Sequence, residues 1–181
     1  MSDSVAGRVW KFGDNINTDL MLPGDVHTGT EEEQARAVFA AIRPGWVNEM
    51  RPGDIIIGGK NYGTGSSRPA ARSLRNIGIA CVVADSINSL FLRNCVNFGL
   101  LALECPGVSA LFPKEGEIAE VSLADFTVTN RNSGKRLTAV PIPDNLLSLM
   151  RGGGIYPVLE REGLIAPKAK ITKAPKASAE H

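Results

Sequence analysis

The sequence has almost no excess of charge, few histidines and no long apolar run. Its 181 residues include 20 Lys and Arg against 19 Asp and Glu, a net charge of +1. This balance gives no electrostatic reason to expect a nucleic acid or an anionic membrane as partner. The longest apolar runs, such as residues 79–84, are far too short to span a bilayer. We therefore expect a cytoplasmic protein, with no nucleic-acid or membrane partner.

Cysteines are scarce and badly spaced for metal binding. Cys81, Cys95 and Cys105 form no C-x-x-C pair, and the chain has only two histidines to accompany them. We expect this chain to hold no metal and no iron–sulfur cluster. Cys81 lies in an apolar run, where a free cysteine is typically a small buried hydrophobic residue.

The length and a hydrophobic content of 43% are typical of one compact domain, expected over residues 1–165. Residues 166–181 are rich in Ala, Lys and Pro and predict a disordered tail. In the middle of the chain, short apolar runs alternate with helical patterns, which implies right-handed crossovers onto a parallel sheet. Strands are expected at 54–58, 79–84 and 100–104, with one helix from Pro69 to about Gly78 and another from Asp85 or Ser86 to about Phe98.

The regions on either side of this core have other patterns. Residues 7–12 predict a first strand, and residues 31–42 predict an amphipathic surface helix with acidic residues in its first turn. After Glu115, short alternating runs indicate a local antiparallel meander. Residues 146–150 predict a last helix that ends at the glycines 152–154.

A glycine-rich stretch, GKNYGTGSSRPAAR at residues 59–72, follows one predicted strand. The phosphate-loop pattern needs a lysine after its last glycine, where this chain has Ser66. The dinucleotide pattern needs a third glycine, where this chain has Arg68. A catalytic triad would need a histidine base, but the histidines are His27 and the terminal His181. These three classes of site are therefore excluded.

The remaining interpretation of this loop is an anion site. Glycine amides and a helix N-terminus favour an anion, and Arg68 is placed to bind a carboxylate through two parallel hydrogen bonds. The alternative is that Gly63 and Gly65 only turn the chain, Ser66 and Ser67 only cap the helix, and Arg68 is solvated. Spacing alone does not decide between the two.

Four ordered motifs carry a resemblance to a known family. They are DNINTD at 14–19, GKNYGTGSSR at 59–68, N-x-x-F-x-R-N-x-x-N-x-G at 88–99 and ECPG at 104–107. Together they resemble the small swivelling domain of the aconitase family, over roughly residues 7–160. The resemblance implies an α/β fold with three β/β/α layers, in which a mostly parallel sheet carries a small antiparallel part.

The resemblance also implies a function. Such a chain would be the small subunit of a two-chain hydro-lyase that dehydrates and rehydrates a branched hydroxy dicarboxylic acid. A large subunit would carry a 4Fe-4S cluster, whose iron takes the substrate hydroxyl as a Lewis acid. By the family pattern Ser66 is the catalytic base, Ser67 and Arg68 bind substrate, and Asp19 belongs to the same site. Serine is a poor base unless loop amides stabilise its alkoxide, and Asp19 has the alternative role of bonding local amides.

Two departures from the family pattern concern the substrate. Relatives usually carry Glu-His-Ala where this chain has Pro-Ala-Ala at 69–71, positions that we interpret as orienting the helix. Many relatives carry a loop with an arginine where residues 25–30 are DVHTGT. Because a third carboxylate needs a cation, this loop argues against citrate-like substrates. His27 and Thr28 become candidate substrate-binding residues, although His27 has the alternative of being simply exposed.

The leading substrate assignment is the isomerisation of 2-isopropylmalate and 3-isopropylmalate in leucine biosynthesis. A dehydratase for a methylated malate or citraconate is the close alternative. A hypothesis of another class is a non-catalytic module that holds a carboxylate with the same loop. A surface meant for a large subunit would also favour a homo-oligomer when the chain is isolated.

Overall fold

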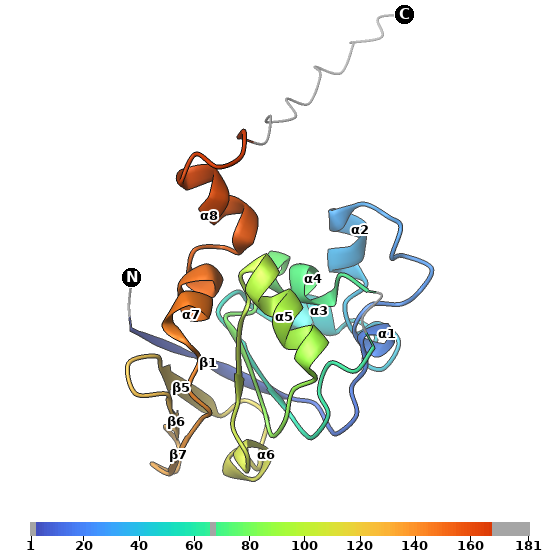
Figure 1. Ribbon diagram of the computed structural model, residues 1–181. Coiled ribbons are helices and arrows are strands. Elements are labelled where there is room, and N and C mark those ends of the chain that lie inside the picture. Colours follow the sequence, from blue (N-terminus) through green and yellow to red (C-terminus); the bar gives the residue numbers. More distant parts are fainter. Residues whose placement is uncertain (1–2, 66–67, 168–181) are drawn as a thin grey trace, which may run out of the picture.

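Figure 1 shows the computed structural model, which describes residues 3–65 and 68–167. The strands form one seven-stranded sheet in the order β4-β3-β2-β1-β5-β6-β7. Its central strand, β1 (Ser4–Lys11), pairs parallel with β2 on one side and antiparallel with β5 on the other. The parallel partners are β2 (Ile55–Gly58), β3 (Cys81–Ala84) and β4 (Leu101–Glu104), and the antiparallel ones are β5 (Ile118–Ser122), β6 (Thr127–Asn130) and β7 (Arg136–Thr138).

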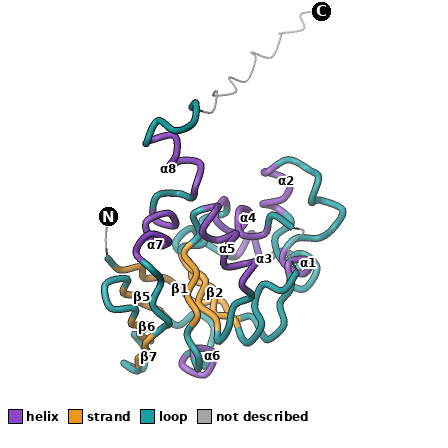
Figure 2. Tube along the Cα trace, in the orientation of Figure 1, coloured by secondary structure: helices purple, strands orange, loops and turns teal. Residues whose placement is uncertain are grey.

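The parallel strands separate two hydrophobic cores. Side chains alternate along β2, so that Ile56 faces one core while Ile55 and Ile57 face the other. The first core lies under helices, and the second is completed by residues of the antiparallel strands, such as Val121 and Val128. Helices, parallel strands and antiparallel strands therefore form three layers (Figure 2), which confirms the predicted β/β/α arrangement. The helices over the first core include α3 (Trp46–Glu49), α4 (Ala70–Asn76) and α5 (Ser89–Phe98).

The predicted strands and crossovers in the middle of the chain are confirmed as β2, α4, β3, α5 and β4. Gly99 ends α5 with a φ of 72°, a conformation that glycine adopts easily. The start of α5 was predicted at Asp85 or Ser86, which is wrong, because Asn88 is the N-cap. Asp85 instead accepts hydrogen bonds from Gly107 and Ser109, and Ser86 accepts them from the loop after β2.

The helix predicted at 31–42 is shorter than expected. A capping box between Thr30 and Glu33 begins α2 (Glu31–Arg36), but the chain then continues in turns. Phe39 has a φ of 56°, and its amide donates to the carbonyl of Met21 instead of continuing the helix. Its ring stacks on Phe12 with the centroids 4.0 Å apart. Burial of this ring explains why the helical pattern is not realised.

The C-terminal region contains one helix more than predicted. The helix expected at 146–150 is α7 (Asp144–Arg151), and a further helix, α8 (Ile155–Arg161), follows the glycines. Pro157 lies in the first turn of α8, where a missing amide is tolerated. The boundary at residue 165 stays a prediction, since the expected tail lies outside the described residues except for 166 and 167.

The antiparallel meander is confirmed as β5, β6 and β7. The sequence did not show that β5 would pair with β1 and so extend the main sheet. The remaining short helices are α1 (Thr18–Met21), after β1, and α6 (Val108–Leu111), after β4. Among the residues that the structure describes, no helix has the length and apolar content needed to cross a membrane.

Candidate active site

All four sequence motifs begin at or shortly after the carboxyl ends of the parallel strands. DNINTD follows β1, the glycine loop follows β2, residues 88–99 begin shortly after β3, and ECPG starts at the last residue of β4. Ligands of open α/β sheets bind at this edge, because the loops from neighbouring strands converge there. The fold therefore gathers segments that are up to about ninety positions apart in the sequence into one region.

The DNINTD turn and the glycine loop are joined along their backbones. The amide of Gly63 donates to the carbonyl of Ile16 at 2.7 Å, and the amide of Thr18 donates to the carbonyl of Thr64 at 2.8 Å. Asn17 caps α1 by accepting from the amide of Leu20. Because these hydrogen bonds join backbone atoms of the two segments, they fix the position of the first turn of α1 relative to the glycine loop.

Asp19 and Arg68 meet across this junction. The Nε atom of Arg68 donates to Oδ1 of Asp19 at 2.8 Å. The Arg68 side chain is 20% exposed, whereas the Asp19 carboxylate is 64% exposed. This bond uses the Nε side of the guanidinium, and among the described residues neither Nη group has a hydrogen-bond acceptor. The arrangement suits an incoming carboxylate, which binds an arginine fork in bidentate fashion.

Gly24 connects this pair to the candidate substrate loop. A Cβ atom at Gly24 would lie 2.9 Å from Nη2 of Arg68, so the guanidinium passes directly over the glycine. The Gly24 carbonyl lies 2.6 Å from Nδ1 of His27. Since a carbonyl only accepts, Nδ1 of His27 is the donor in this contact.

The other predicted site residues are placed less closely. His27 is exposed and reaches the Asp19–Arg68 pair only through Gly24. Thr28 is exposed, and within the described ranges it makes no hydrogen bond to Asp19, His27 or Arg68. The predicted base Ser66 and the predicted ligand Ser67 lie outside the described residues. The functional roles assigned to all six residues remain predictions.

Two residues of the site were missed by the sequence argument, namely Thr18 and Gly24. Thr18 is buried, and its Oγ1 atom would lie 3.0 Å from a Cβ atom at Gly65. Thr18 belongs to the DNINTD motif, which was the available signal, whereas Gly24 lies in none of the four motifs. Neither contact follows from the spacing along the chain.

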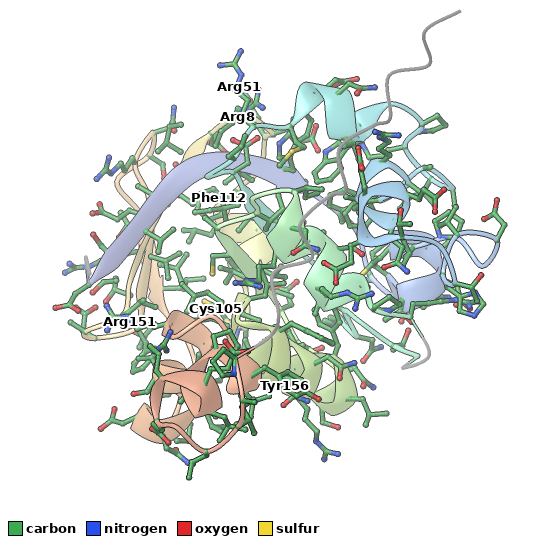
Figure 3. The ribbon with its side chains drawn as sticks, turned by 90° about the horizontal axis from the view of Figure 1, so that it is seen from above. Arg8, Arg51, Cys105, Phe112, Arg151 and Tyr156 are labelled. Atoms are coloured by element: carbon green, nitrogen blue, oxygen red, sulfur yellow. The ribbon has the colours of Figure 1, made fainter. Side chains whose placement is uncertain are left out.

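The cysteines do not fit an iron–sulfur cluster. All three are buried, as predicted for Cys81, and Cys105 lies inside the molecule in Figure 3. Burial raises the pKa of the thiols of Cys81 and Cys95. Burial and the nearby Asp85 carboxylate raise the pKa of Cys105 to about 11. Thiolates are the metal-binding form, and the described part of the chain holds no group of three His, Cys, Asp or Glu suited to a metal.

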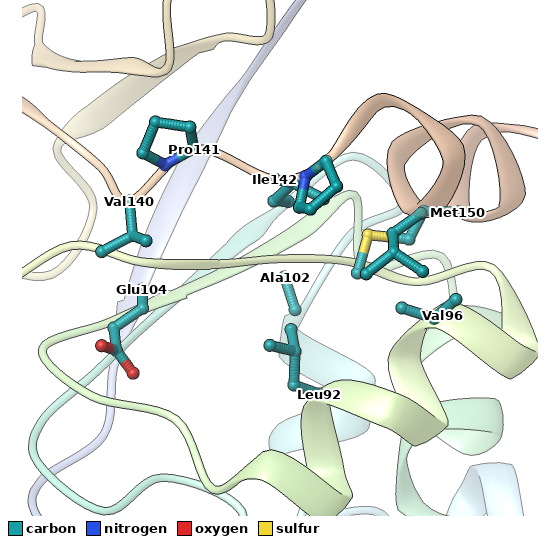
Figure 4. Close-up of a pocket in the computed structure, with 10 residues that line it drawn as sticks. Leu92, Val96, Ala102, Glu104, Val140, Pro141, Ile142 and Met150 are labelled. Atoms are coloured by element: carbon teal, nitrogen blue, oxygen red, sulfur yellow. The ribbon is translucent and has the colours of Figure 1, made fainter.

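An apolar pocket lies away from Arg68, between α5, β4 and residues 140–143 (Figure 4). Its lining includes aliphatic side chains such as Leu92, Val96 and Met150. The charged residue of this lining, Glu104, accepts a hydrogen bond from the backbone amide of Ile87 at 2.9 Å. The negative charge of Glu104 would repel a carboxylate ligand, and the lining offers no cation to bind it. The loop around Arg68 is therefore the better candidate site.

The comparisons agree with this geometry. A family model for the aconitase C-terminal domain matches residues 14–107, which contain all four motifs. The chain belongs to the aconitase family.

Its similarity is to separate small subunits of this family. The 3-isopropylmalate dehydratase small subunit 1 of Methanopyrus kandleri is 41% identical over 90% of this chain and 96% of its own length. The isopropylmalate/citramalate isomerase small subunit of Methanocaldococcus jannaschii is 39% identical, over 90% of this chain and 97% of its own length. The crystal structure of 3-isopropylmalate dehydratase (leuD) from Methanocaldococcus jannaschii matches with a TM-score of 0.81 and 29% identity, covering 89% of this chain and 96% of that one.

Proposed function

We propose that this chain is the small subunit of a two-chain hydro-lyase, and that the complex interconverts 2-isopropylmalate and 3-isopropylmalate in leucine biosynthesis. The observation that carries the proposal is the Arg68 guanidinium, which Asp19 holds through Nε and whose Nη groups contact no acceptor among the described residues. The names and the full-length similarity of the relatives support the same assignment. We place the complex in the cytoplasm.

Each site residue has a defined part in this proposal. Arg68 binds a substrate carboxylate and thereby fixes the carbon from which a proton is removed. Asp19 orients the guanidinium, and Ser66 removes the proton, a step for which a positioned base supplies about 10²- to 10⁴-fold in rate. Ser67 and His27 offer further polar contacts to substrate. Because the cysteines of this chain do not fit a cluster, the Lewis acid that takes the substrate hydroxyl would come from a 4Fe-4S cluster of the large subunit.

A methylated malate is the second candidate substrate. The Methanocaldococcus jannaschii relative carries citramalate as well as isopropylmalate in its name. The segment Asp25–Thr28 has no cation, and Val26 is its one aliphatic residue. A single valine on a loop limits the size of the apolar arm weakly, so the site is compatible with a methyl or an isopropyl group.

The test is turnover by the assembled enzyme. The chain is co-expressed with a candidate large subunit, the cluster is reconstituted without oxygen, and alkene absorbance is followed with 3-isopropylmalate, citraconate and cis-aconitate in separate reactions. Turnover of isopropylmalate is the expected result, and turnover of citraconate alone would move the substrate to the methylated malates. A complex with an intact cluster and no turnover would reject the hydro-lyase and favour a non-catalytic carboxylate-binding module.

The oligomeric state of the isolated chain tests the expectation that it forms a homo-oligomer in the absence of a large subunit. Without a large subunit, we expect it to form a homo-oligomer that exchanges for the two-chain complex when the large subunit is added. Light scattering after gel filtration measures both states, and a monomer at all concentrations would contradict the expectation.

A further inference from the structure

Gln34, on α2, is a buried polar residue with three side-chain hydrogen bonds. The residue is 2% exposed. Its Nε2 atom donates to the carbonyl oxygens of His27 at 2.8 Å and Gly29 at 3.1 Å, and its Oε1 atom accepts from Nη2 of Arg72 at 2.9 Å. A carbonyl only accepts and a guanidinium only donates, so these partners determine the orientation of the amide. An apolar residue at this position would bind neither partner, so the amide does more than fill space.

Both carbonyls belong to residues 25–30, the segment predicted to contact substrate, which we call the substrate loop. Among the described residues, the other hydrogen bonds of residues 25–29 stay within residues 23–29, as in the bond from the amide of Gly29 to the carbonyl of Val26 at 2.9 Å. In the part of the chain that the structure describes, Gln34 is therefore the residue whose hydrogen bonds join the middle of this loop to another element.

Arg72 continues this link to α4, the helix that follows Arg68. Its guanidinium donates to Gln34, lies 3.5 Å from Oε1 of Glu31 and is placed 5.8 Å from the ring centroid of Phe98. The Arg72 side chain is 29% exposed, so the bond to Gln34 is partly shielded from water. One helix therefore begins next to Arg68 and also holds the amide that binds the substrate loop.

The substrate loop meets the candidate site at its other end. A Cβ atom at Gly24 would lie 2.9 Å from Nη2 of Arg68, and Nδ1 of His27 lies 2.6 Å from the Gly24 carbonyl. A carboxylate bound by the Nη groups of Arg68 would therefore lie beside Gly24, and the rest of the substrate would be within reach of the loop that follows. The position of this loop then limits the space left for the substrate.

We propose that Gln34 is a positioning residue that sets the distance between the substrate loop and Arg68, and thereby selects the size of the apolar arm of the substrate. The inference rests on the proposed function. Gln34 acts through the carbonyls of His27 and Gly29 and touches no substrate atom. The substrate class is a hydroxy dicarboxylic acid with a branched aliphatic arm, for which Val26 is the aliphatic residue of the loop.

Release of the loop should affect a large arm more than a small one. Each hydrogen bond from Gln34 contributes a factor of about 2 to 10 to the equilibrium between the held and the released loop. An isopropyl arm buries more apolar surface against the loop than a methyl arm does, so it loses more binding when the loop moves away. We therefore expect KM to change with the size of the arm, while kcat changes less than about threefold.

Gln34→Glu separates the two halves of this link. The carboxylate still accepts from Arg72 but has no N–H group to donate to the two loop carbonyls. The double variant Gln34→Leu/Arg72→Leu also releases the loop, and it replaces both partners of the contact between α2 and α4 by apolar groups, a change that is nearly neutral for stability. Asn76→Ala is the matched control, because Nδ2 of Asn76 donates to Oε2 of Glu31 at 3.0 Å, a bond that joins the same two helices without involving the loop.

The first measurement uses the isolated chain and needs no turnover. Amide hydrogen exchange at Val26 and Gly29, followed by NMR, reports the opening of the loop. We expect about tenfold faster exchange in Gln34→Glu and in the double variant, because each loses two hydrogen bonds to the loop, and wild-type rates in Asn76→Ala. Wild-type exchange in both released-loop variants would overturn the inference and leave the proposed function intact.

The second measurement uses the assembled, cluster-loaded complex. The substrate is 3-isopropylmalate, and 3-methylmalate is added as a competitor that keeps both carboxylates and has a smaller arm. We expect KM for 3-isopropylmalate to rise about tenfold in Gln34→Glu and in the double variant, with the inhibition constant of 3-methylmalate changed less than about threefold.

Other kinetic results would contradict this role. Equal losses of affinity for the two compounds, or a fall in kcat alone, would make Gln34 a structural residue without influence on the choice of substrate. The same KM increase in Asn76→Ala would assign the effect to the packing of α2 on α4. A wild-type complex that is inactive with an intact cluster would reject the proposed function and the selection of substrate with it, whereas the exchange rates would still show whether Gln34 holds the loop.

Discussion

Arg68 donates from Nε to Oδ1 of Asp19 at 2.8 Å, although the two residues are 49 positions apart. The bond joins the turn after β1 to the loop after β2, the two segments that the parallel pairing of these strands brings together. A guanidinium held through Nε has its planar orientation fixed before a ligand arrives. This lowers the entropy lost on binding a carboxylate.

Arg68→Lys should weaken substrate binding. A lysine ammonium is a point charge that cannot form two parallel hydrogen bonds to a carboxylate or keep the Nε contact to Asp19. We expect KM to rise roughly 10- to 100-fold, the effect of losing charge-assisted hydrogen bonds. Steady-state kinetics of the assembled enzyme measure the change. Arg36→Lys, on the exposed face of α2, is the control, and an unchanged KM for Arg68→Lys would withdraw the carboxylate contact.

Ser66→Ala should abolish turnover while substrate still binds. Loss of a positioned base lowers kcat by about 10²-fold or more, and binding through Arg68 should stay within a few-fold of wild type. Turnover and direct binding of the substrate to the complex are measured separately. Ser148→Ala on α7 serves as control. Unchanged turnover would remove Ser66 as the base.

Gly24→Ala should act on Arg68 without unfolding the chain. The added methyl group would lie 2.9 Å from Nη2 of Arg68, the far end of a flexible side chain that can move aside. We expect KM to rise about tenfold as the guanidinium is displaced, with a melting temperature close to wild type. Gly13→Ala, where nothing lies within 4 Å of the added atom, is the matched control. A Gly24→Ala enzyme with wild-type KM would show that the guanidinium position is not critical.

Asp54 should make the chain sensitive to acid. The carboxylate is 5% exposed and accepts from Nη2 of Arg8 at 2.8 Å, Nε1 of Trp10 at 2.7 Å and the amide of Arg51 at 2.9 Å. Arg8 and Arg51, labelled in Figure 3, both donate to the same oxygen of Asp54, Oδ2. Burial alone raises the pKa of Asp54, but the hydrogen bonds from Arg8, Arg51 and Trp10 outweigh it and lower the pKa below its ordinary value.

The lowered pKa fixes the sign of the pH effect. The stabilisation by Asp54 is fully present above the ordinary carboxyl pKa of the unfolded chain, and is lost as the pH falls through the lower pKa of the folded chain. Asp54→Asn should lower the free energy of unfolding by about 3 kcal/mol at pH 7, because it leaves Arg8 without its buried partner. Urea unfolding from pH 7 to pH 3 tests this, with Asp144→Asn as control, because Asp144 is an exposed residue of α7. A variant as stable as wild type at pH 7 would contradict the prediction.

The sequence predicts the middle of this fold well because local signals there agree. The β-branched run at 55–57 and the glycines 78 and 99 mark strand and helix ends that tertiary packing leaves in place. The predicted helix boundaries are wrong where tertiary contacts compete with the local sequence pattern. Phe39 leaves the helical pattern to bury its ring against Phe12, and Asp85 contacts the turn after β4 instead of capping α5.

The sequence predicted which residues belong to the candidate site, but not how these residues contact one another. The motifs named Asp19 and Arg68, yet their contact depends on the register of β1 against β2, which no local pattern encodes. The close approach of Thr18 to Gly65, and of Gly24 to the Arg68 guanidinium, was likewise absent from the sequence pattern. Such distances follow only from the packed chain.

The central place of β1 has a consequence for synthesis of the chain. One edge of β1 pairs with β2, whose synthesis is complete at Gly58. The other edge pairs with β5, whose synthesis is complete only at Ser122. A nascent chain that extends past Arg68 but not yet to Ser122 contains every residue of the site, yet still exposes one edge of its central strand. Unpaired edges recruit other strands and promote aggregation. A fragment that stops after ECPG should therefore precipitate, although the whole catalytic surface is encoded before that point.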